Sequence, residues 1–201
     1  MGFLPTDYKI PEKSSYCKLK DGANNIRILS SAVVGWEYWN TDNKPVRSRT
    51  PYTTMPSDIK IDKDGNTTKI KHFWAFIVWN YEAEAVQILE VTQSTIQGAI
   101  KAMVDNKKWG NPEGFDITIT RTGEGFDTEY SVMPNPHSPV EPKIKAALKA
   151  LPINLEALYD GSNPFGESKK EDGRDDEGFA KSIVAPELPQ EERPNVEDIP
   201  F

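Results

Sequence analysis

Residues 68–81, with the sequence TKIKHFWAFIVWNY, constrain the fold of this chain more than any other stretch. The stretch is rich in aromatic and β-branched residues, and the turn-forming sequence DKDGN at 62–66 precedes it. This composition predicts a β-strand, the strongest in the chain. Successive side chains of a strand point to opposite faces, so Lys71 and Phe73 share one face and Trp74 lies on the other. At least one of the two rings is therefore expected to pack in the core.

The segments around this strand predict further strands and one internal helix. Residues 24–40 (NNIRILSSAVVGWEYWN) are expected to form one long strand. Residues 45–54 form a return segment that Pro45 and Pro51 confine to a sheet edge or a loop. The remaining elements expected are a strand at 85–91, a helix at 95–106 capped by Thr92 or Ser94, two hairpin strands at 115–121 and 126–133, and a short amphipathic helix at 142–152.

The order of these elements indicates the fold class. Strands, one internal helix and two further strands follow one another as in an OB-fold, a small five-stranded barrel that commonly binds single-stranded nucleic acids. The expected fold is therefore mainly β, of the α+β class: a five-stranded OB-fold barrel with one internal helix and a short C-terminal helical segment. Other α+β folds combine the same elements and stay open as alternatives.

Negative charge is concentrated at the C-terminal end of the chain. Residues 166–201 contain eleven acids and five bases, so this segment carries −6 of the formal net charge of −7. Its stretches SKKEDGRDDEG and APELPQEERP are polar and contain too few apolar side chains to offset the entropy of ordering them. We expect residues 1–165 to form the folded, DNA-binding domain and residues 166–201 to form a disordered acidic tail.

Basic and aromatic residues alternate in the first half of the folded part. Residues 44–71 contain seven bases and three acids, and aromatic clusters flank them on both sides. Single-stranded DNA is bound by this combination, because cations follow the phosphates while bases stack on the rings. Aromatic residues are also ordinary strand core residues, so the composition leaves both interpretations open. The candidate DNA contacts from this pattern are Trp36, Trp39, Arg47, Arg49 and Tyr52.

The sequence offers no pattern for catalysis, a metal or a membrane. Cys17 is the single cysteine, and His72 and His137 are expected to be a packed and a loop histidine, so no zinc site, other metal or cofactor is predicted. No phosphate-binding loop or nucleophile elbow is present, and no enzymatic activity is expected. No apolar run approaches the roughly 18 residues of a membrane helix, so we expect a cytoplasmic protein without a membrane partner.

The last residues, EDIPF, resemble the acidic C-terminal tip of bacterial single-stranded DNA-binding proteins. In that family, acids precede Ile-Pro-Phe, and the terminal phenylalanine docks into basic, apolar pockets on replication and repair enzymes. The resemblance implies that a partner enzyme is bound by the tip residues Glu197, Asp198, Ile199, Pro200 and Phe201.

The folded part resembles a different family. The stretch TKIKHFWAFIVWN, followed by VQILEVTQSTIQGAIKAMV, is similar to the core of the T4-type phage single-stranded DNA-binding proteins over roughly residues 20–135. There, a basic strand with an aromatic pair lines the DNA cleft of an OB-fold. The zinc ligands of that family are missing here, so its zinc site is not implied. The resemblance implies DNA contacts by Lys69, Lys71, Phe73 and Trp74, and we prefer Phe73 as the stacking ring because it shares a face with the two lysines.

Together these patterns predict a phage protein, in the cytoplasm of its bacterial host, that coats single-stranded DNA in replication, recombination and repair. Its tip would recruit enzymes, and its acidic tail could lie across its own DNA cleft until DNA displaces it. The alternative is an interaction adaptor with an acidic docking tail and no DNA contact. The net charge of only −1 on residues 1–165 favours this alternative, and the basic and aromatic pattern opposes it. A Mg²⁺-dependent nuclease ranks third.

Overall fold

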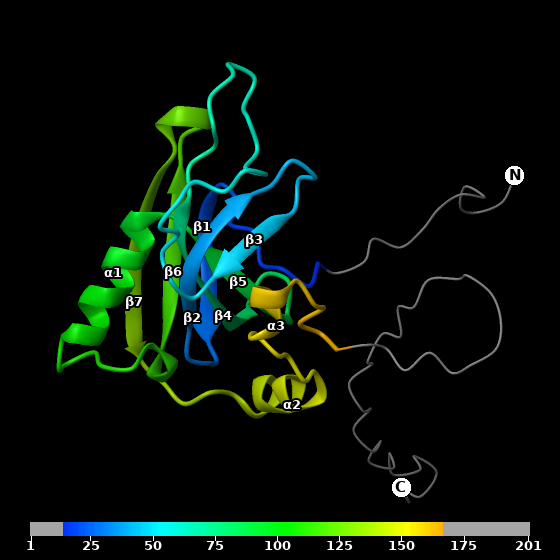
Figure 1. Ribbon diagram of the computed structural model, residues 1–201. Helices are drawn as coiled ribbons and strands as arrows, with labels where there is room; N and C mark the ends of the chain where they lie inside the picture. Colours follow the sequence, from blue (N-terminus) through cyan, green and yellow to red (C-terminus); the bar gives the residue numbers. More distant parts are fainter. Residues whose placement is uncertain (1–13, 167–201) are drawn as a thin grey trace, which may run out of the picture. The chain divides into compact units, whose positions relative to one another are not determined.

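The computed structural model describes residues 14–166, and the predicted acidic tail and its tip lie outside these residues. The described part is mainly β, with seven strands joined in one sheet (Figure 1). No helix within it is long and apolar enough to cross a membrane. The strands are β1 (Gly22–Ile28), β2 (Val33–Trp39), β3 (Pro45–Ser48), β4 (Lys71–Asn80), β5 (Ala85–Val91), β6 (Phe115–Thr122) and β7 (Glu129–His137). The helices are α1 (Ser94–Asp105), α2 (Pro142–Ala150) and α3 (Ala157–Asp160), with short 3₁₀ turns η1 (Pro112–Gly114) and η2 (Gly125–Asp127).

Strand β4, the strand expected from residues 68–81, is at the centre of this arrangement. It pairs antiparallel with β5 along one edge, and with β2 and then β1 along the other. The prediction of one long strand at 24–40 is wrong. This segment forms two strands, β1 and β2, which both pair with the same edge of β4. The division lies at Ser30, whose Oγ accepts a hydrogen bond from the backbone N–H of Ile77 at 3.0 Å and so replaces a backbone partner.

The strand order is β3-β2-β4-β1-β6-β7, with β5 attached to β4. This connectivity is consistent with an OB-like α+β fold, but the sheet has seven strands and not five, and the pairings among the described residues do not close a barrel. The outer edge of β5 is partly occupied by the N-terminal segment. Cys17 donates its N–H to the carbonyl of Ile88 at 2.8 Å, and Ile88 donates to Ser15 at 3.0 Å.

Two hydrophobic cores lie on the two faces of the sheet. The first joins side chains of β1, β4 and β6 to α1, whose Ile96, Ile100 and Met103 are buried. The second joins the opposite face of β4 and β5 to Ile144 of α2 and to the α3 region. Figure 1 shows α1 beside β6 and β7, and α2 and α3 on the side of β4 and β5.

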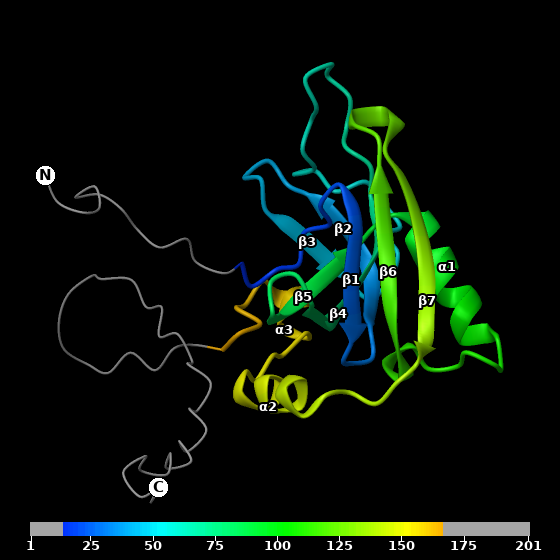
Figure 2. The same ribbon diagram turned by 180° about the vertical axis from the view of Figure 1, so that it is seen from behind.

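The downstream elements follow the sequence pattern closely. The β6–β7 hairpin and α2 are confirmed, and Figure 2 shows β1, β6 and β7 side by side from behind. The hairpin turn requires Gly123, which has φ +77° and whose Cβ, if added, would lie 2.2 Å from the carbonyl oxygen of Asp127. The predicted cap of α1 is wrong, since the N-cap residue is Gln93, without a side-chain hydrogen bond. Helix α3 was not predicted.

Candidate nucleic-acid interface

The two faces of β4 have different surroundings. Phe73 lies on the face that α2 and α3 cover, here called the covered face, and none of its surface is exposed. Trp74 lies on the opposite face, which packs against α1 further along the strand; we call it the open face because Trp74 is partly exposed there. A ring without exposed surface presents no face to a base, so this burial does not support our preference for Phe73 as the stacking ring. The cause is the cover supplied by the C-terminal segment, to which Phe73 contributes a core side chain.

Three partly exposed rings form a row across β2 and β4 on the open face. Trp36 is paired in register with His72, and their ring centroids are 5.1 Å apart. The His72 ring lies 6.5 Å from that of Trp74, and both contacts are edge to face. Gln97 of α1 donates to the carbonyl of His72 at 3.1 Å and so holds the helix against the row. We call Trp36, His72 and Trp74 the aromatic row.

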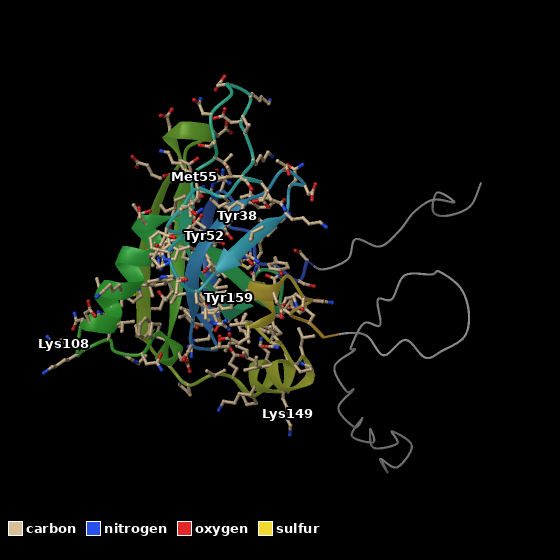
Figure 3. The ribbon with its side chains drawn as sticks, viewed as in Figure 1. Tyr38, Tyr52, Met55, Lys108, Lys149 and Tyr159 are labelled. Atoms are coloured by element: carbon tan, nitrogen blue, oxygen red, sulfur yellow. The ribbon has the colours of Figure 1, made fainter. Side chains whose placement is uncertain are left out.

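The other two predicted aromatic contacts lie away from this row. Trp39 is 46% exposed, but it points to the covered side of β2, where it lines a small cleft with Arg47. Tyr52 is half-buried and packs edge to face on Tyr38 at 5.2 Å (Figure 3). Tyr38 donates its hydroxyl to Asp58 at 2.8 Å, and burial raises the pKa of Tyr38 to about 12. The Tyr38–Tyr52 pair thus belongs to the packing of the β3–β4 segment.

Arg47 is held inside the protein by two carboxylates. Its guanidinium contacts Glu37 at 3.1 Å and Glu90 at 2.9 Å, and its side chain is only 7% exposed. It also lies 5.2 Å from the centre of the Phe73 ring. Burial raises the pKa of Glu90 above its ordinary 4.5, and the neighbouring Glu37 adds to the effect. A phosphate would have to displace both acids to reach Arg47.

Arg49 is exposed but paired with a residue of the C-terminal segment. Its guanidinium forms an ion pair with Glu156 and lies 4.2 Å from the centre of the Tyr159 ring. Tyr159 in turn donates its hydroxyl to the carbonyl of Val34 at 2.7 Å, which fixes α3 against β2 (Figure 3). A carboxylate and an aromatic ring therefore occupy the two sides of Arg49 that a nucleotide would use.

Two of the predicted cations are accessible. Lys69 and Lys71 are both exposed, and within residues 14–166 neither forms an ion pair with an acid. They precede and begin β4, one to five residues before the rings of the aromatic row on that strand. Lys71 begins β4 in register with Glu37, so its side chain starts on the face of Phe73, opposite to that of the aromatic row.

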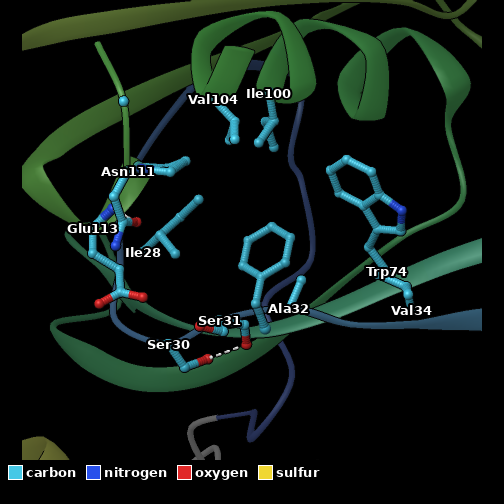
Figure 4. A pocket seen from close by; sticks show the side chains of 13 residues that line it. Ile28, Ser30, Ser31, Ala32, Val34, Trp74, Ile100, Val104, Asn111 and Glu113 are labelled. Atoms are coloured by element: carbon cyan, nitrogen blue, oxygen red, sulfur yellow. Dashed lines mark hydrogen bonds between the residues drawn. The ribbon is translucent and has the colours of Figure 1, made fainter. Parts of the chain in front are cut away.

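An apolar cleft of about 460 Å³ adjoins the aromatic row (Figure 4). Trp74 forms one wall, and the exposed Val34 and Val104 lie at its rim. Asn111 and Glu113, next to η1, are its polar residues on the side opposite Trp74 (Figure 4). The cleft could not be predicted from the sequence, because its walls come from segments far apart in the chain. The one available signal was Val104, which shares the helix face of Ile100 but is half exposed.

The described residues offer no alternative chemistry of metals or thiols. Within 14–166, no group of three or more His, Cys, Asp or Glu side chains could hold a metal ion. Cys17 is buried, and this burial raises its pKa to about 11, so the thiol stays protonated and unreactive at neutral pH.

Comparison with known proteins gives one informative match. The chain is 24% identical over 143 residues to a protein of Escherichia phage T5 named "Probable ssDNA-binding protein". The match covers 60% of this chain and 55% of the relative, so the chain spans about half the length of the curated protein that it matches. No protein-family model matches the chain, and no solved structure matches it at a significant level.

Proposed function

We propose that this protein binds single-stranded DNA through the open face of β2 and β4. The observation that carries the proposal is the aromatic row, whose partly exposed rings lie beside an apolar cleft. Lys69 and Lys71, at the start of the same strand, are exposed and form no ion pair within residues 14–166. The name of the phage T5 relative supports the same class of ligand. Bases would stack on Trp36 and Trp74 while the lysines neutralise phosphates, as in other single-strand binders.

The proposal assigns different roles to the residues predicted from the sequence. Phe73 and Arg47 serve the core and its ion pairs, so we leave them out of the contact set. Arg49 joins the contact set only when DNA phosphates compete with Glu156 for its guanidinium. Binding is therefore non-enzymatic, depends weakly on sequence, and weakens as salt concentration rises.

We also propose a biological role, based on the resemblance of the sequence to known single-stranded DNA-binding proteins. The protein would have an OB-like body and coat single-stranded DNA in phage replication, recombination and repair, and the segment Glu197–Phe201 would recruit an enzyme. The acidic residues 166–201 would compete with DNA for the basic surface. Removal of residues 166–201 is then expected to raise the affinity for single-stranded DNA, and unchanged or lower affinity in a binding titration would contradict this competition.

A titration with oligonucleotides tests the proposed function. Single-stranded and double-stranded DNA of equal length are added at several salt concentrations, and tryptophan emission is followed. Strong quenching by the single strand, a weaker response to the duplex and a steep salt dependence are expected. Absence of binding at low salt would refute the proposal and favour the adaptor alternative, while metal-dependent cleavage of the DNA would indicate a nuclease.

A further inference from the structure

The cleft beside Trp74 combines apolar walls with two polar side chains at one side. Its inner surface is formed by Ile28, Phe76 and Ile100, which are buried, and Trp74 supplies a flat aromatic wall. Figure 4 shows Asn111 and Glu113 on the opposite side from Trp74. With about 460 Å³, the cleft has room for one planar heterocycle. It is also continuous with the aromatic row, because Trp74 belongs to both.

The polar side of the cleft lacks a partner for its carboxylate. Within residues 14–166, the side chain of Glu113 forms no hydrogen bond and no ion pair, although the residue is half-buried. Asn111 accepts from the N–H of Glu113 at 3.0 Å through Oδ1, so its amide Nδ2 remains available as a donor. An ionised carboxylate only accepts hydrogen bonds. A ligand that fits this cleft therefore has a flat apolar body and N–H donors at its edge.

Unstacked nucleobases have this combination, and they differ in their donors. Single-stranded bases can stack on an aromatic side chain while their Watson–Crick edge is hydrogen-bonded. Guanine presents adjacent N1–H and N2–H₂ groups at that edge, which match the two oxygens of one carboxylate. Thymine presents a single N–H between two carbonyl oxygens, which would repel the carboxylate. Adenine and cytosine each offer one amino group.

We infer that this cleft binds one unstacked base of the single strand, with the base against Trp74 and its donor edge on the Glu113 carboxylate, so that guanine is preferred and thymine disfavoured. The inference rests on the proposed function and adds a base preference to it. The occupant is a base and not an acidic peptide, because Glu113 would repel carboxylates. Glu113 is thus a specificity residue on a surface that otherwise binds any sequence.

The test compares a thymine-only oligonucleotide with one of equal length that carries a single central guanine. We expect the full-length protein to bind the guanine-containing strand about tenfold more tightly, as one good bidentate contact to a base provides. Replacing that guanine by hypoxanthine, which lacks the N2 amino group, is expected to remove part of the preference. The Glu113→Gln variant should bind both strands with nearly equal affinity.

A matched variant controls for the loss of one negative charge. Glu84 is exposed in the β4–β5 turn and forms no ion pair within the described residues. The Glu84→Gln variant carries the same charge change and should keep the full preference for guanine. Circular dichroism and thermal unfolding of both variants establish that they are folded.

The outcomes separate the inference from the proposed function. If neither strand binds, the proposed function fails and the inference falls with it. If both strands bind equally to the wild type, single-strand binding stands and the inference alone is wrong. Dimerisation that a Val104→Asp variant abolishes, without a base preference, would assign the cleft to a second copy. That result would overturn the inference.

Discussion

The two faces of β4 carry similar side chains but differ in what lies on them. On the covered face, Phe73 is fully buried beneath the C-terminal segment, and Arg47 is neutralised by Glu37 and Glu90. On the open face, Trp74 borders an apolar cleft and Trp36 is partly exposed. Adjacent residues of one strand therefore have opposite roles, one in stability and one in the proposed DNA contact.

Aromatic and basic composition therefore does not by itself locate a binding surface. A ring contributes to binding only where no other element of the chain covers it. On the covered face, α3 and its N-cap residue supply a ring, Tyr159, and a carboxylate, Glu156, next to Arg49. The chain itself thus occupies positions that a nucleotide could otherwise take. The following predictions test the comparison, beginning with the largest effect.

The strongest test is removal of the Phe73 ring. Phe73→Ala creates a cavity in the second core, and we expect it to lower the free energy of unfolding by about 3–5 kcal/mol. Urea denaturation measures this change. Under conditions where the variant is folded, its affinity for single-stranded DNA should stay near that of the wild type. A large loss of affinity in folded protein would mean that the covered face contacts DNA.

The complementary change is on the neighbouring residue of the open face. Trp74→Ala removes a partly exposed ring, and we expect it to weaken single-stranded DNA binding by about 1–3 kcal/mol. Its effect on the free energy of unfolding should be clearly smaller than that of Phe73→Ala. Fluorescence anisotropy with a labelled oligonucleotide gives the affinity. Unchanged affinity would remove Trp74 from the contact set.

A smaller effect is expected at the ion pair between Arg49, directly after β3, and Glu156, the N-cap residue of α3. Glu156→Gln frees Arg49 for phosphates, and since both side chains are more than half exposed we expect affinity to rise only about twofold to threefold. The increase should shrink at higher salt, and the double variant Glu156→Gln with Arg49→Gln should lose it. An equal increase in the double variant, whose net charge is that of the wild type, would show that Arg49 is not responsible.

The smallest effect concerns the buried acid of the covered face. The pKa of Glu90 is raised in the folded protein, mainly by burial, from an ordinary value of 4.5. The folded state therefore holds this proton to higher pH than the unfolded state, and the Glu90 contribution to stability falls as pH rises from about 4.5 through the raised pKa. Thermal unfolding of wild type and Glu90→Gln across this range should show the fall only in the wild type. Parallel curves would contradict it.

The sequence predicted strand β4 and the opposite orientation of Phe73 and Trp74, but it did not predict which face of β4 would be covered. Strand parity correctly placed Phe73 and Trp74 on opposite faces, and the expected strands at 71–80 and 85–91 are present. Which face would be covered depended on α2 and α3, about 70 residues further along the chain. Helix α3 has four residues, too few for a periodic pattern, so its position over Phe73 and Arg49 was not predictable from local sequence.

Two further features of the structure, the break between β1 and β2 and the apolar cleft, were also not predictable from the sequence. The break between β1 and β2 depends on one hydrogen bond from Ile77 to Ser30, and no glycine or proline marks it in the sequence. The apolar cleft forms only because the β1–β2 loop, β4, α1 and the residues around η1 meet in three dimensions. The predictions for the tail and its tip remain predictions, since they concern residues outside 14–166.

Photo-cross-linking shows which face of β4 the DNA contacts. The full-length protein is irradiated with single-stranded DNA that carries 5-bromodeoxyuridine, and the linked residues are identified by mass spectrometry. We expect adducts at Trp36 or Trp74 on the open face. Adducts confined to Trp39 or Tyr159, with none on the aromatic row, would contradict this expectation and place the DNA on the covered face.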